Sequence, residues 1–303
     1  MRKKVDVIVV NWDSGEKTLH AVQPYINYES ATIICNIIVV DNASIDDSLF
    51  ILKNKVNRII ANDKNLGFGK ACNQALKESN ADYVLLLNPD TISEPVVLEE
   101  LVKYLEENRE YGITGPRQVD DNKNILKTCG RFRTFKTALF ELIGLSKLLP
   151  YLFTPVPIMT DWDHLESKEV DQVIGSYMVI RRSLINDIGF MDEDFFVYAE
   201  DTDLSIRFKY AGYKTFYNSD VSIFHKCGGT GNLRKANRLF YSLSSRRKYW
   251  EKHLGKSNSY VLTTISILIE PFLRMIDSLI KERNPQVITI GRAYLMYIKE
   301  IIR

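Results

Sequence analysis

The sequence predicts an α/β protein with a mostly parallel sheet flanked by helices, followed by a C-terminal helical extension. Three observations indicate this fold: short apolar runs rich in Val and Ile recur, each ends in a polar turn, and a helix-like pattern follows each turn. The predicted strands are VDVIVV at 5–10, NIIVV at 36–40, RIIA at 58–61 and YVLLLN at 83–88.

Residues from about 115 to 168 have a less regular pattern, and we expect an insertion or a loose lobe beside the sheet. Strand-like patterns return afterwards, at 172–180, 214–217 and 221–224. An amphipathic helix is predicted to begin near residue 200, because Leu204, Phe208 and Ala211 fall on one apolar stripe. Further helices follow from about residue 233.

Charge divides the chain unevenly. Residues 231–303 contain 14 Lys and Arg against 5 Asp and Glu, a net charge of +9, which leaves residues 1–230 at −7. A basic tail on an acidic body suggests an anionic partner surface, either nucleic acid or lipid head groups. We therefore predict a division at residue 230, between the α/β body at 1–230 and a basic amphipathic helical tail at 231–303.

The tail contains one long apolar segment, residues 260–280, which Glu270, Pro271, Arg274 and Asp277 interrupt. Charges at mid-span would cost a few kcal/mol each, so an interfacial helix or a helix packed on a partner subunit is expected rather than a transmembrane one. A helix packed against the chain's own body is an equal alternative. Nucleic acid is not an expected partner, because the basic residues are not interleaved with aromatics in a recognisable motif.

The N-terminus is basic and then apolar, but Asp6 interrupts it and no small-residue cleavage site follows, so no secretory signal peptide is expected. Cys35, Cys72, Cys129 and Cys227 form no C-x-x-C pair. They indicate neither a disulfide framework nor a zinc knuckle, and they fit a reducing cytosol.

Polar residues stand just past the C-terminal ends of four predicted strands: Asn11, Asp41, Asn65 with Gly67, and Asn88 with Asp90. Ligands of open α/β sheets bind at that edge, so these four loops are expected to converge on one cleft. A carboxylate such as Asp41 can accept from a ribose hydroxyl or a base N–H, although Asp-Asn-Ala-Ser is also ordinary turn chemistry.

The stretch NLGFGKACN, residues 65–73, is a broken dinucleotide fingerprint, because Cys72 replaces the third glycine. Its glycines more plausibly let backbone approach a ligand, with Asn65 and Asn73 as polar contacts; a plain left-handed turn is the alternative. Asn88-Pro89-Asp90 can hold one Mg²⁺ or Mn²⁺ that bridges to substrate phosphates, or it can be only a turn.

Two further positions carry candidate chemistry. His225 follows a strand and becomes a metal ligand only if it faces Asp90. Glu200, Asp201 and Asp203 gather at the start of the predicted helix, where acids complement the helix dipole. Asp203 is spaced to pair with Arg207, whereas a neighbouring acid could instead take a proton from a substrate.

Taken together, the stretches VIVVNW, VVDNAS, NLGFGKACN, LLLNPD, IGSYMVIRR, FFVYAEDTDLSIRFKYAGY and HKCGGT resemble the inverting nucleotide-sugar glycosyltransferases of family 2. These enzymes have the Rossmann-like GT-A fold, and the resemblance is closest to the bacterial rhamnosyltransferase-like branch. The stretches run in family order over residues 5–230. The basic tail is similar to the membrane-apposed C-terminal helices of members that glycosylate lipid-linked acceptors.

The resemblance implies roles for the donor side. Asp41 would hold the base or ribose, helped by Val10, Asn11 and the loop from Asn65 through Gly67 to Asn73. Asn88-Pro89-Asp90 stands where many relatives carry Asp-x-Asp, the metal and diphosphate site, and His225 would complete the coordination of Mg²⁺ or Mn²⁺.

For the acceptor side, the resemblance implies Asp201 as general base beside Glu200, with Gly175, Ser176 and Tyr198 near the acceptor. The implied reaction transfers a sugar to a hydroxyl of a lipid-linked or polysaccharide acceptor in cell-surface glycan synthesis. The sugar that the resemblance favours is L-rhamnose, from deoxythymidine-diphosphate rhamnose. The implied location is the cytoplasmic face of the cell membrane, with a homo-oligomer through the C-terminal helices as an alternative use of the tail.

Other functions stay open at this point. A uridine-diphosphate hexose is the next donor to consider. A sugar-phosphate nucleotidyltransferase would need a glycine-rich basic loop after the first strand, where NWDSGEKT supplies one glycine and no arginine. A non-catalytic nucleotide-sugar-binding protein would keep Asp41 and Asp90 but would not need Asp201.

Overall fold

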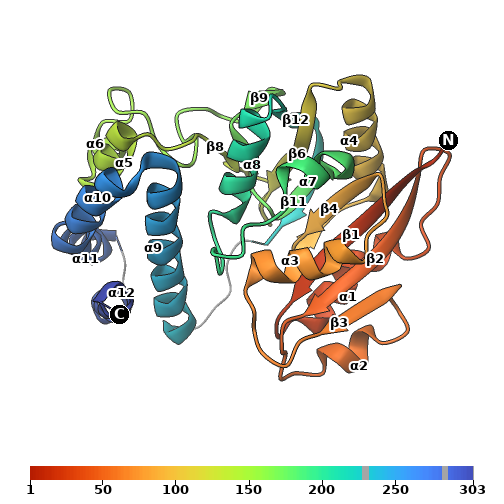
Figure 1. Ribbon diagram of the computed structural model, residues 1–303, viewed down its shortest axis with the longest axis horizontal. Helices are drawn as coiled ribbons and strands as arrows, with labels where there is room; N and C mark the ends of the chain where they lie inside the picture. Colours follow the sequence, from red (N-terminus) through yellow and green to blue (C-terminus); the bar gives the residue numbers. More distant parts are fainter. Residues whose placement is uncertain (227–231, 282–285, 303) are drawn as a thin grey trace. The chain divides into compact units, whose positions relative to one another are not determined.

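The computed structural model describes residues 1–226, 232–281 and 286–302 (Figure 1). The chain forms two compact units that are interleaved in sequence. The sheet unit comprises Met1–Arg131, Trp162–Glu193 and Glu200–Cys227, and the helical unit comprises Phe132–Asp161, Asp194–Ala199 and Gly228–Arg303.

The strands of the sheet unit are β1 (Lys3–Asn11), β2 (Ile33–Asp41), β3 (Arg58–Ala61), β4 (Tyr83–Leu87), β5 (Thr91–Ile92), β6 (Tyr111–Val119), β7 (Ile125–Leu126), β8 (Cys129–Gly130), β9 (Lys168–Val170), β10 (Gln172–Val173), β11 (Tyr177–Arg181) and β12 (Lys214–His225). Its helices are α1 (Gly15–Val22), α2 (Ser48–Leu52), α3 (Phe68–Lys77), α4 (Pro95–Glu107), α7 (Arg182–Ile188) and α8 (Glu200–Tyr210), with the short 3₁₀ helix η1 (Gln23–Tyr25).

The main sheet has the order β3-β2-β1-β4-β11-β6-β12-β5. Strands β3, β2, β1 and β4 are parallel, as the sequence predicts. Beyond β4 the sheet is mixed, because β11 runs antiparallel to both β4 and β6, while β12 is parallel to β6. The predicted α/β class with flanking helices is confirmed.

Alternating side chains of β1, β2 and β4 form one core with the buried faces of α1 and α4. Helix α3 packs against β1 and β2 through small buried residues, Ala71, Cys72 and Ala75. Strand β4 is buried along its whole length. Strands covered on both faces have continuous apolar sequences, which is why β1, β2 and β4 were visible in the sequence.

The region expected to be irregular begins too early, because residues 115–119 belong to strand β6, which lies inside the sheet. Its sequence YGITGPRQV contains Gly115 and Pro116, which ordinarily argue against a central strand. The ladder of β6 with β11 covers only Ile113 and Thr114, so Pro116 need not donate an N–H to β11, and on the other side Pro116 pairs with Asn218 of β12 where that register shifts. Similarly, β12 is one strand with register shifts rather than two separate strands.

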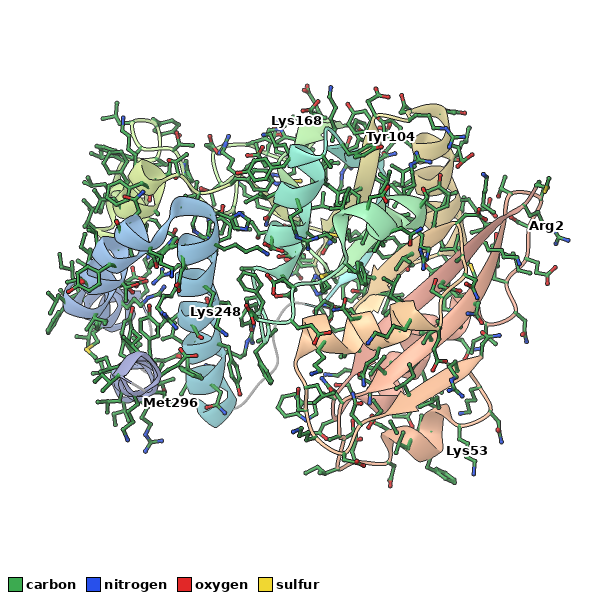
Figure 2. The ribbon with its side chains drawn as sticks, in the orientation of Figure 1. Arg2, Lys53, Tyr104, Lys168, Lys248 and Met296 are labelled. Carbon is green, nitrogen blue, oxygen red and sulfur yellow. The ribbon has the colours of Figure 1, made fainter. Side chains whose placement is uncertain are left out.

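The helical unit contains α5 (Phe135–Leu142), α6 (Leu145–Leu148), α9 (Asn232–Leu254), α10 (Lys256–Leu268), α11 (Glu270–Lys281) and α12 (Val287–Ile302). Helix α9 packs on α10 and α12, and α10 packs on α5. Within this unit, Ser245 Oγ donates to the Val197 carbonyl (2.8 Å) and Lys248 Nζ to the Asp194 carbonyl (2.6 Å), which attaches the short segment 194–199 to α9. Lys248 is labelled on α9 in Figure 2.

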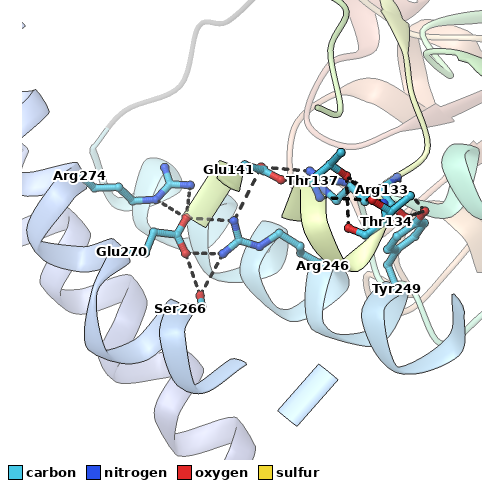
Figure 3. A network of polar contacts seen from close by, with 9 residues as sticks. All are labelled: Arg133, Thr134, Thr137, Glu141, Arg246, Tyr249, Ser266, Glu270 and Arg274. Atoms are coloured by element: carbon cyan, nitrogen blue, oxygen red, sulfur yellow. Dashed lines mark hydrogen bonds and ion pairs between the residues drawn. The ribbon is translucent and has the colours of Figure 1, made fainter. Parts of the chain in front are cut away.

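A buried polar network holds α11 within the helical unit (Figure 3). Arg246 Nη1 of α9 donates to Glu270 Oε1 (2.9 Å), and the second guanidinium nitrogen donates to the other oxygen. Ser266 Oγ donates to Glu270 (2.7 Å), and Arg274 Nε does so one turn along α11 (2.9 Å). Helix α11 also has an exposed apolar stripe, formed by Phe272, Ile276 and Ile280.

The functional division of the chain into two domains at residue 230 stays a prediction. In the structure, residues 132–161 and 194–199, which precede that division, cluster with the C-terminal helices.

The apolar segment 260–280 is two helices rather than the single one expected. They are bent by 43° between Leu268 and Glu270. Pro271 lies in the first turn of α11, where its missing N–H is unpaired in any helix. Among the described residues, no single helix is long and apolar enough to cross a membrane, whereas α10 and α11 counted together meet that length and composition.

Candidate active site

The ends of β1 and β2 form a buried polar cluster around Asp41. Asn11 Nδ2 donates to Asp41 Oδ1 (2.7 Å), and Thr18 Oγ1 donates to Asn11 Oδ1 (2.6 Å). Ser44 donates twice to the same carboxylate, through its backbone N (3.0 Å) and its Oγ (2.6 Å). Val10, one residue before Asn11, is half-buried. Asp41 thus fixes the end of β1 and its own turn, and its contact with a nucleotide stays a prediction.

The loop from Asn65 to Gly67 is fastened to the end of β2. Asn42 Nδ2 donates to Asn65 Oδ1 (3.0 Å) and to the Gly67 carbonyl (3.1 Å), and Gly67 N donates to Asn65 Oδ1 (2.9 Å). Gly67 has φ 88° and ψ 168°, a conformation that only glycine adopts without strain. The sequence therefore placed these residues correctly at one edge of the sheet.

Asn73 is engaged within the chain. Its Nδ2 donates to the Met191 carbonyl (2.9 Å), and its Oδ1 accepts from Met191 N (3.1 Å). Both ends of the amide hold the 191 segment against α3, and a direct contact with the donor stays a prediction.

The loop after β4 meets His225 and Ser176. Asn88 N donates to the Ser176 carbonyl (2.9 Å), and Lys226 N donates to the Asp90 carbonyl (3.0 Å). Asp90 Oδ1 lies 3.3 Å from His225 Nε2. His225 therefore does face Asp90, which is the arrangement that makes it a candidate metal ligand.

Gln118 of β6 orients this histidine and was missed in the sequence. Its Oε1 lies 2.9 Å from His225 Nδ1, and its Nε2 donates to Ser176 Oγ (2.8 Å). An amide oxygen is an acceptor, so Nδ1 is the donor in this contact, and Nε2 is the ring nitrogen that faces Asp90. The only sequence feature that could have indicated Gln118 is a polar residue near the end of a strand. It was missed because the sequence GPRQV, residues 115–119, does not have the pattern of a strand.

The second carboxylate group begins α8. The two preceding residues, Tyr198 and Ala199, have φ of 70° and 67°, so the backbone turns sharply into the helix. Asp201 Oδ2 accepts from Gly175 N (3.1 Å), and Asp201 Oδ1 accepts from Thr202 N (2.7 Å). Glu200 is buried, and its Oε2 has no hydrogen-bond partner.

The dipeptide Gly175-Ser176 joins the two groups. Gly175 N donates to Asp201, and the next carbonyl, that of Ser176, accepts from Asn88 N two residues before Asp90. Asp201 and the loop that carries Asp90, which come from distant parts of the sequence, are therefore both bonded to one short segment of the sheet unit. A two-carboxylate site stays a prediction.

Comparison with known proteins now identifies the family. The sequence model described as Glycosyl transferase family 2 matches residues 6–189, more than half of the chain. The chain belongs to glycosyltransferase family 2. This confirms the resemblance that the sequence motifs carry.

Two relatives of this chain are named for the transfer of different sugars. The chain is 24% identical over 214 residues to N-acetylglucosaminyl-diphospho-decaprenol L-rhamnosyltransferase of Mycobacterium tuberculosis, covering 65% of this chain and 68% of that protein. It is 26% identical over 215 residues to the low-salt glycan biosynthesis hexosyltransferase Agl10 of Haloferax volcanii, covering 68% and 62%.

A solved structure confirms the GT-A fold. A mannosyltransferase from Pyrobaculum calidifontis, in complex with GDP-Man and Mn²⁺, superposes with a TM-score of 0.57 at 13% sequence identity. The match covers 99% of this chain and 88% of the mannosyltransferase. At this identity the likeness concerns the fold alone.

The residues of this glycosyltransferase fit a divalent cation in part. Within the described ranges, no group of three or more His, Cys, Asp and Glu side chains could hold a metal. Asp90 and His225 supply two possible metal ligands. Their facing atoms, Asp90 Oδ1 and His225 Nε2, are 3.3 Å apart, and two lone pairs at that distance repel each other unless a proton or a cation lies between them. A carboxylate and an imidazole suit Mn²⁺, and Mg²⁺ also binds with few protein ligands when phosphates supply the rest.

The two acids of α8 are driven to different protonation states. Burial, reinforced by the negative charge of Asp201, raises the pKa of Glu200 to about 8. Burial also raises the pKa of Asp201, but hydrogen bonds from the backbone of Gly175 and Thr202 oppose that rise. The pKa of Glu200 therefore lies above neutral pH, whereas backbone hydrogen bonds hold the pKa of Asp201 down against burial, so Asp201 is the member better suited to accept a proton.

The third acid has the structural role predicted for it. The fully buried Asp203 side chain pairs with Arg207 Nε (2.8 Å) one turn later in α8. Arg207 also donates to the carbonyls of Ile188 and Gly189 (both 3.0 Å). This prediction is confirmed.

Tyr198 and residues 227–230 of the HKCGGT stretch, both named from the sequence, are not part of this cluster of described residues. Tyr198 belongs to the helical unit, where Arg238 Nε donates to its hydroxyl (3.1 Å), and its acceptor-side role stays a prediction. Residues 227–230 of the HKCGGT stretch lie outside the described residues.

Proposed function

We propose that this chain is an inverting glycosyltransferase that moves a sugar from a nucleoside diphosphate onto a hydroxyl of a glycan acceptor. The observation that supports this most is that two carboxylate-bearing segments are both bonded to Gly175-Ser176. Asp201 is the candidate base, and Asp90 with His225 forms the candidate cation site.

In this mechanism Asp201 takes the proton from the acceptor hydroxyl as that oxygen attacks the sugar carbon. A positioned base of this kind contributes typically 10²–10⁴-fold to the rate. The hydrogen bond from Gly175 N holds the carboxylate in place, and the neutral Glu200 leaves one negative charge in the acidic pair. Attack from the side opposite the leaving diphosphate inverts the configuration of the sugar carbon.

Asp90 and His225 would hold Mg²⁺ or Mn²⁺ beside the diphosphate. When bound, such a cation neutralises the negative charge that develops on the leaving diphosphate. Gln118 holds the ring of His225 so that Nε2 faces Asp90, and the Asn88–Ser176 bond fixes the Asp90 loop to the turn that carries Gly175.

For the donor we propose deoxythymidine-diphosphate rhamnose, with uridine-diphosphate hexoses as the alternative. A named rhamnosyltransferase and a named hexosyltransferase among the relatives support these two candidates at similar identity. The proposed acceptor is a lipid-linked or polysaccharide glycan of the cell surface. The proposed location is cytoplasmic, peripheral at the inner face of the cell membrane, and the basic charge of residues 231–303 supports it.

A thermal-shift screen of nucleotide sugars, with and without Mn²⁺, tests the donor site. A ligand at 100 times its Kd adds ~2.7 kcal/mol to stability, so a true donor raises the melting temperature measurably. A shift with a uridine-diphosphate hexose alone would replace rhamnose as the sugar. No shift with any nucleoside diphosphate would contradict the donor-site assignment.

A further inference from the structure

A pocket lies at the edge of the sheet opposite to the candidate active site. Strands β1, β4 and β11 are neighbours in the sheet (Figure 1). Lys3 begins β1, Tyr83 begins β4, and Arg181, at the end of the antiparallel β11, pairs with Tyr83. These three residues line the pocket, whereas the same strands reach the candidate site at their other ends, near Asn11 and Asn88. The pocket is therefore separate from the candidate site.

This basic pocket has a volume of about 460 Å³, within the range of about 300–1,000 Å³ that is typical of small-molecule sites. Its charged lining consists of four cations, Lys3, Arg109, Arg181 and Arg182, and two carboxylates, Asp82 and Glu106. Four positive charges against two negative charges leave an excess of two positive charges. Such an excess in a concave site attracts an anion.

Three of the four cations share one carboxylate. Lys3 Nζ lies 3.0 Å and Arg109 Nη2 lies 3.1 Å from Glu106 Oε2. Arg181 Nη1 lies 3.6 Å from the other oxygen, Oε1, which also accepts from the Tyr83 hydroxyl. Glu106 can neutralise only one of these three positive charges.

Arg181 is a buried charge without a carboxylate of its own. Its side chain is fixed in the wall of the basic pocket, and the residue is only 7% exposed. Nη1 donates to the Tyr83 hydroxyl (2.9 Å) and Nη2 to the Leu105 carbonyl, which are both neutral acceptors. Nε has no hydrogen-bond partner among the described residues. A buried cation is costly unless it is paired, so an anion in the pocket would lower this cost.

Arg182 is also bonded to neutral groups. Its Nη1 donates to Asn186 Oδ1, and its Nη2 donates to the Ser79 carbonyl (3.5 Å). Across the part of the chain that the structure describes, no carboxylate forms an ion pair with it. An arginine presents a planar fork of N–H donors that matches the oxygens of a phosphate group.

We propose that the basic pocket binds the phosphate group of a small phosphorylated molecule, with Lys3, Arg109 and Arg182 as its cationic ligands. A phosphate monoester carries a charge of about −1.5 to −2 at neutral pH, which balances the excess of two positive charges. Asn80 and Ser183 also line the pocket, and amide and hydroxyl groups can exchange hydrogen bonds with a polar organic part.

An extended polyanion fits the basic pocket less well than a small one. Residues 1–230 carry a net charge of −7, so the surface beyond the pocket does not favour a long chain of phosphates. The ligand is therefore small enough for its charge to lie inside the pocket.

The test is titration calorimetry of the full chain with glucose 6-phosphate, inorganic phosphate and glucose, at low ionic strength and with EDTA present. EDTA removes divalent cations, so no metal can hold phosphate at Asp90. We expect both phosphates to bind and glucose not to bind. Tighter binding of glucose 6-phosphate would identify an organic phosphate as the ligand, and equal binding would identify the free anion. No nucleotide sugar is present, so this result is independent of the proposed transferase activity.

Variants place the bound phosphate. Arg182→Gln should weaken the binding of glucose 6-phosphate at least about ten-fold, because charge-assisted hydrogen bonds to phosphate are lost. Arg109→Gln should also weaken binding, and the Arg109 side chain is 67% exposed, so this variant leaves the interior intact. The matched control Arg58→Gln removes the same charge from an exposed pair with Glu78 and should bind like the unchanged chain.

Two results would overturn the proposal. One is equal affinity of the Arg182, Arg109 and Arg58 variants for glucose 6-phosphate, since the phosphate would then bind elsewhere. The other is the absence of binding by both phosphates, or binding of glucose as tight as that of glucose 6-phosphate.

Discussion

Replacement of Glu200 by Gln tests the protonation states on which the assignment of the base depends. In the folded chain, burial and the charge of Asp201 raise the pKa of Glu200 from 4.5 to about 8. Between these values the folded protein keeps a proton that the unfolded chain releases. Stability therefore falls as pH rises through this window, because the unfolded state binds fewer protons than the folded state.

The size of the effect follows from those two pKa values. One unit of pKa shift corresponds to about 1.4 kcal/mol, so the free energy of unfolding should fall by about 2 kcal/mol between pH 5 and pH 7 through this group alone. Gln has nearly the same shape and cannot ionise. Glu200→Gln should therefore become more stable than the unchanged protein as pH rises, by about 2 kcal/mol over that interval.

Urea unfolding at a series of pH values, with both proteins measured side by side, gives this difference directly. The matched control is Glu78→Gln, an exposed acid whose partner Arg58 lowers its pKa, so its difference should not grow with pH. A difference for Glu200→Gln that stays constant from acid to neutral pH would refute the reasoning, because Glu200 would then ionise normally and Asp201 would not be the distinct charged member.

Three further outcomes are expected. Gln118→Leu removes the acceptor for His225 Nδ1 and should weaken Mn²⁺ binding, measured by calorimetry with a nucleoside diphosphate present, by about 10–100-fold; affinity within a factor of two of the unchanged protein would remove Gln118 from the site. Gly67→Ala, at φ 88°, should cost about 1–3 kcal/mol in urea unfolding, and a neutral result would show that the loop conformation is not required. Arg246→Leu leaves Glu270 buried with fewer partners and should cost about 3–5 kcal/mol, whereas Arg58→Leu at an exposed pair should cost under about 1 kcal/mol; equal costs would contradict the importance of the buried network.

The parts of the fold that sequence predicts well are local. Strands β1, β2 and β4 are largely buried, so their apolar runs are continuous, whereas the edge strand β3 is partly exposed; the polar residues at the strand ends mark one edge of the sheet. Asp203 and Arg207 are four residues apart on one helix, so their pairing also follows from spacing alone.

The parts that sequence does not predict depend on long-range packing. Strand β6 contains Gly115-Pro116, and the proline lies beyond its short ladder with β11 and next to a register shift in its ladder with β12. Gln118 gains its role from His225, which comes from a strand much later in the chain. The outward apolar stripe of α11 follows from the partner of Glu270 on α9, and helical periodicity cannot say which side of a helix meets that partner.

The same limit applies to Asn73. As a polar residue in a glycine-containing loop, it has the pattern of a ligand contact, yet its amide binds the backbone of Met191. Nothing in the local sequence distinguishes a side chain that binds a ligand from one that fastens two segments of the same chain.

The most direct measurement is transfer by Asp201→Asn, compared with the unchanged protein and with Asp187→Asn, an exposed acid on α7. Donor binding, measured by thermal shift, should be retained in both variants, while transfer by Asp201→Asn should fall by about 10²–10⁴-fold and transfer by Asp187→Asn should not change. Transfer at the unchanged rate by Asp201→Asn would contradict the account, because the Asp201 carboxylate would then not be the group that receives the acceptor's proton.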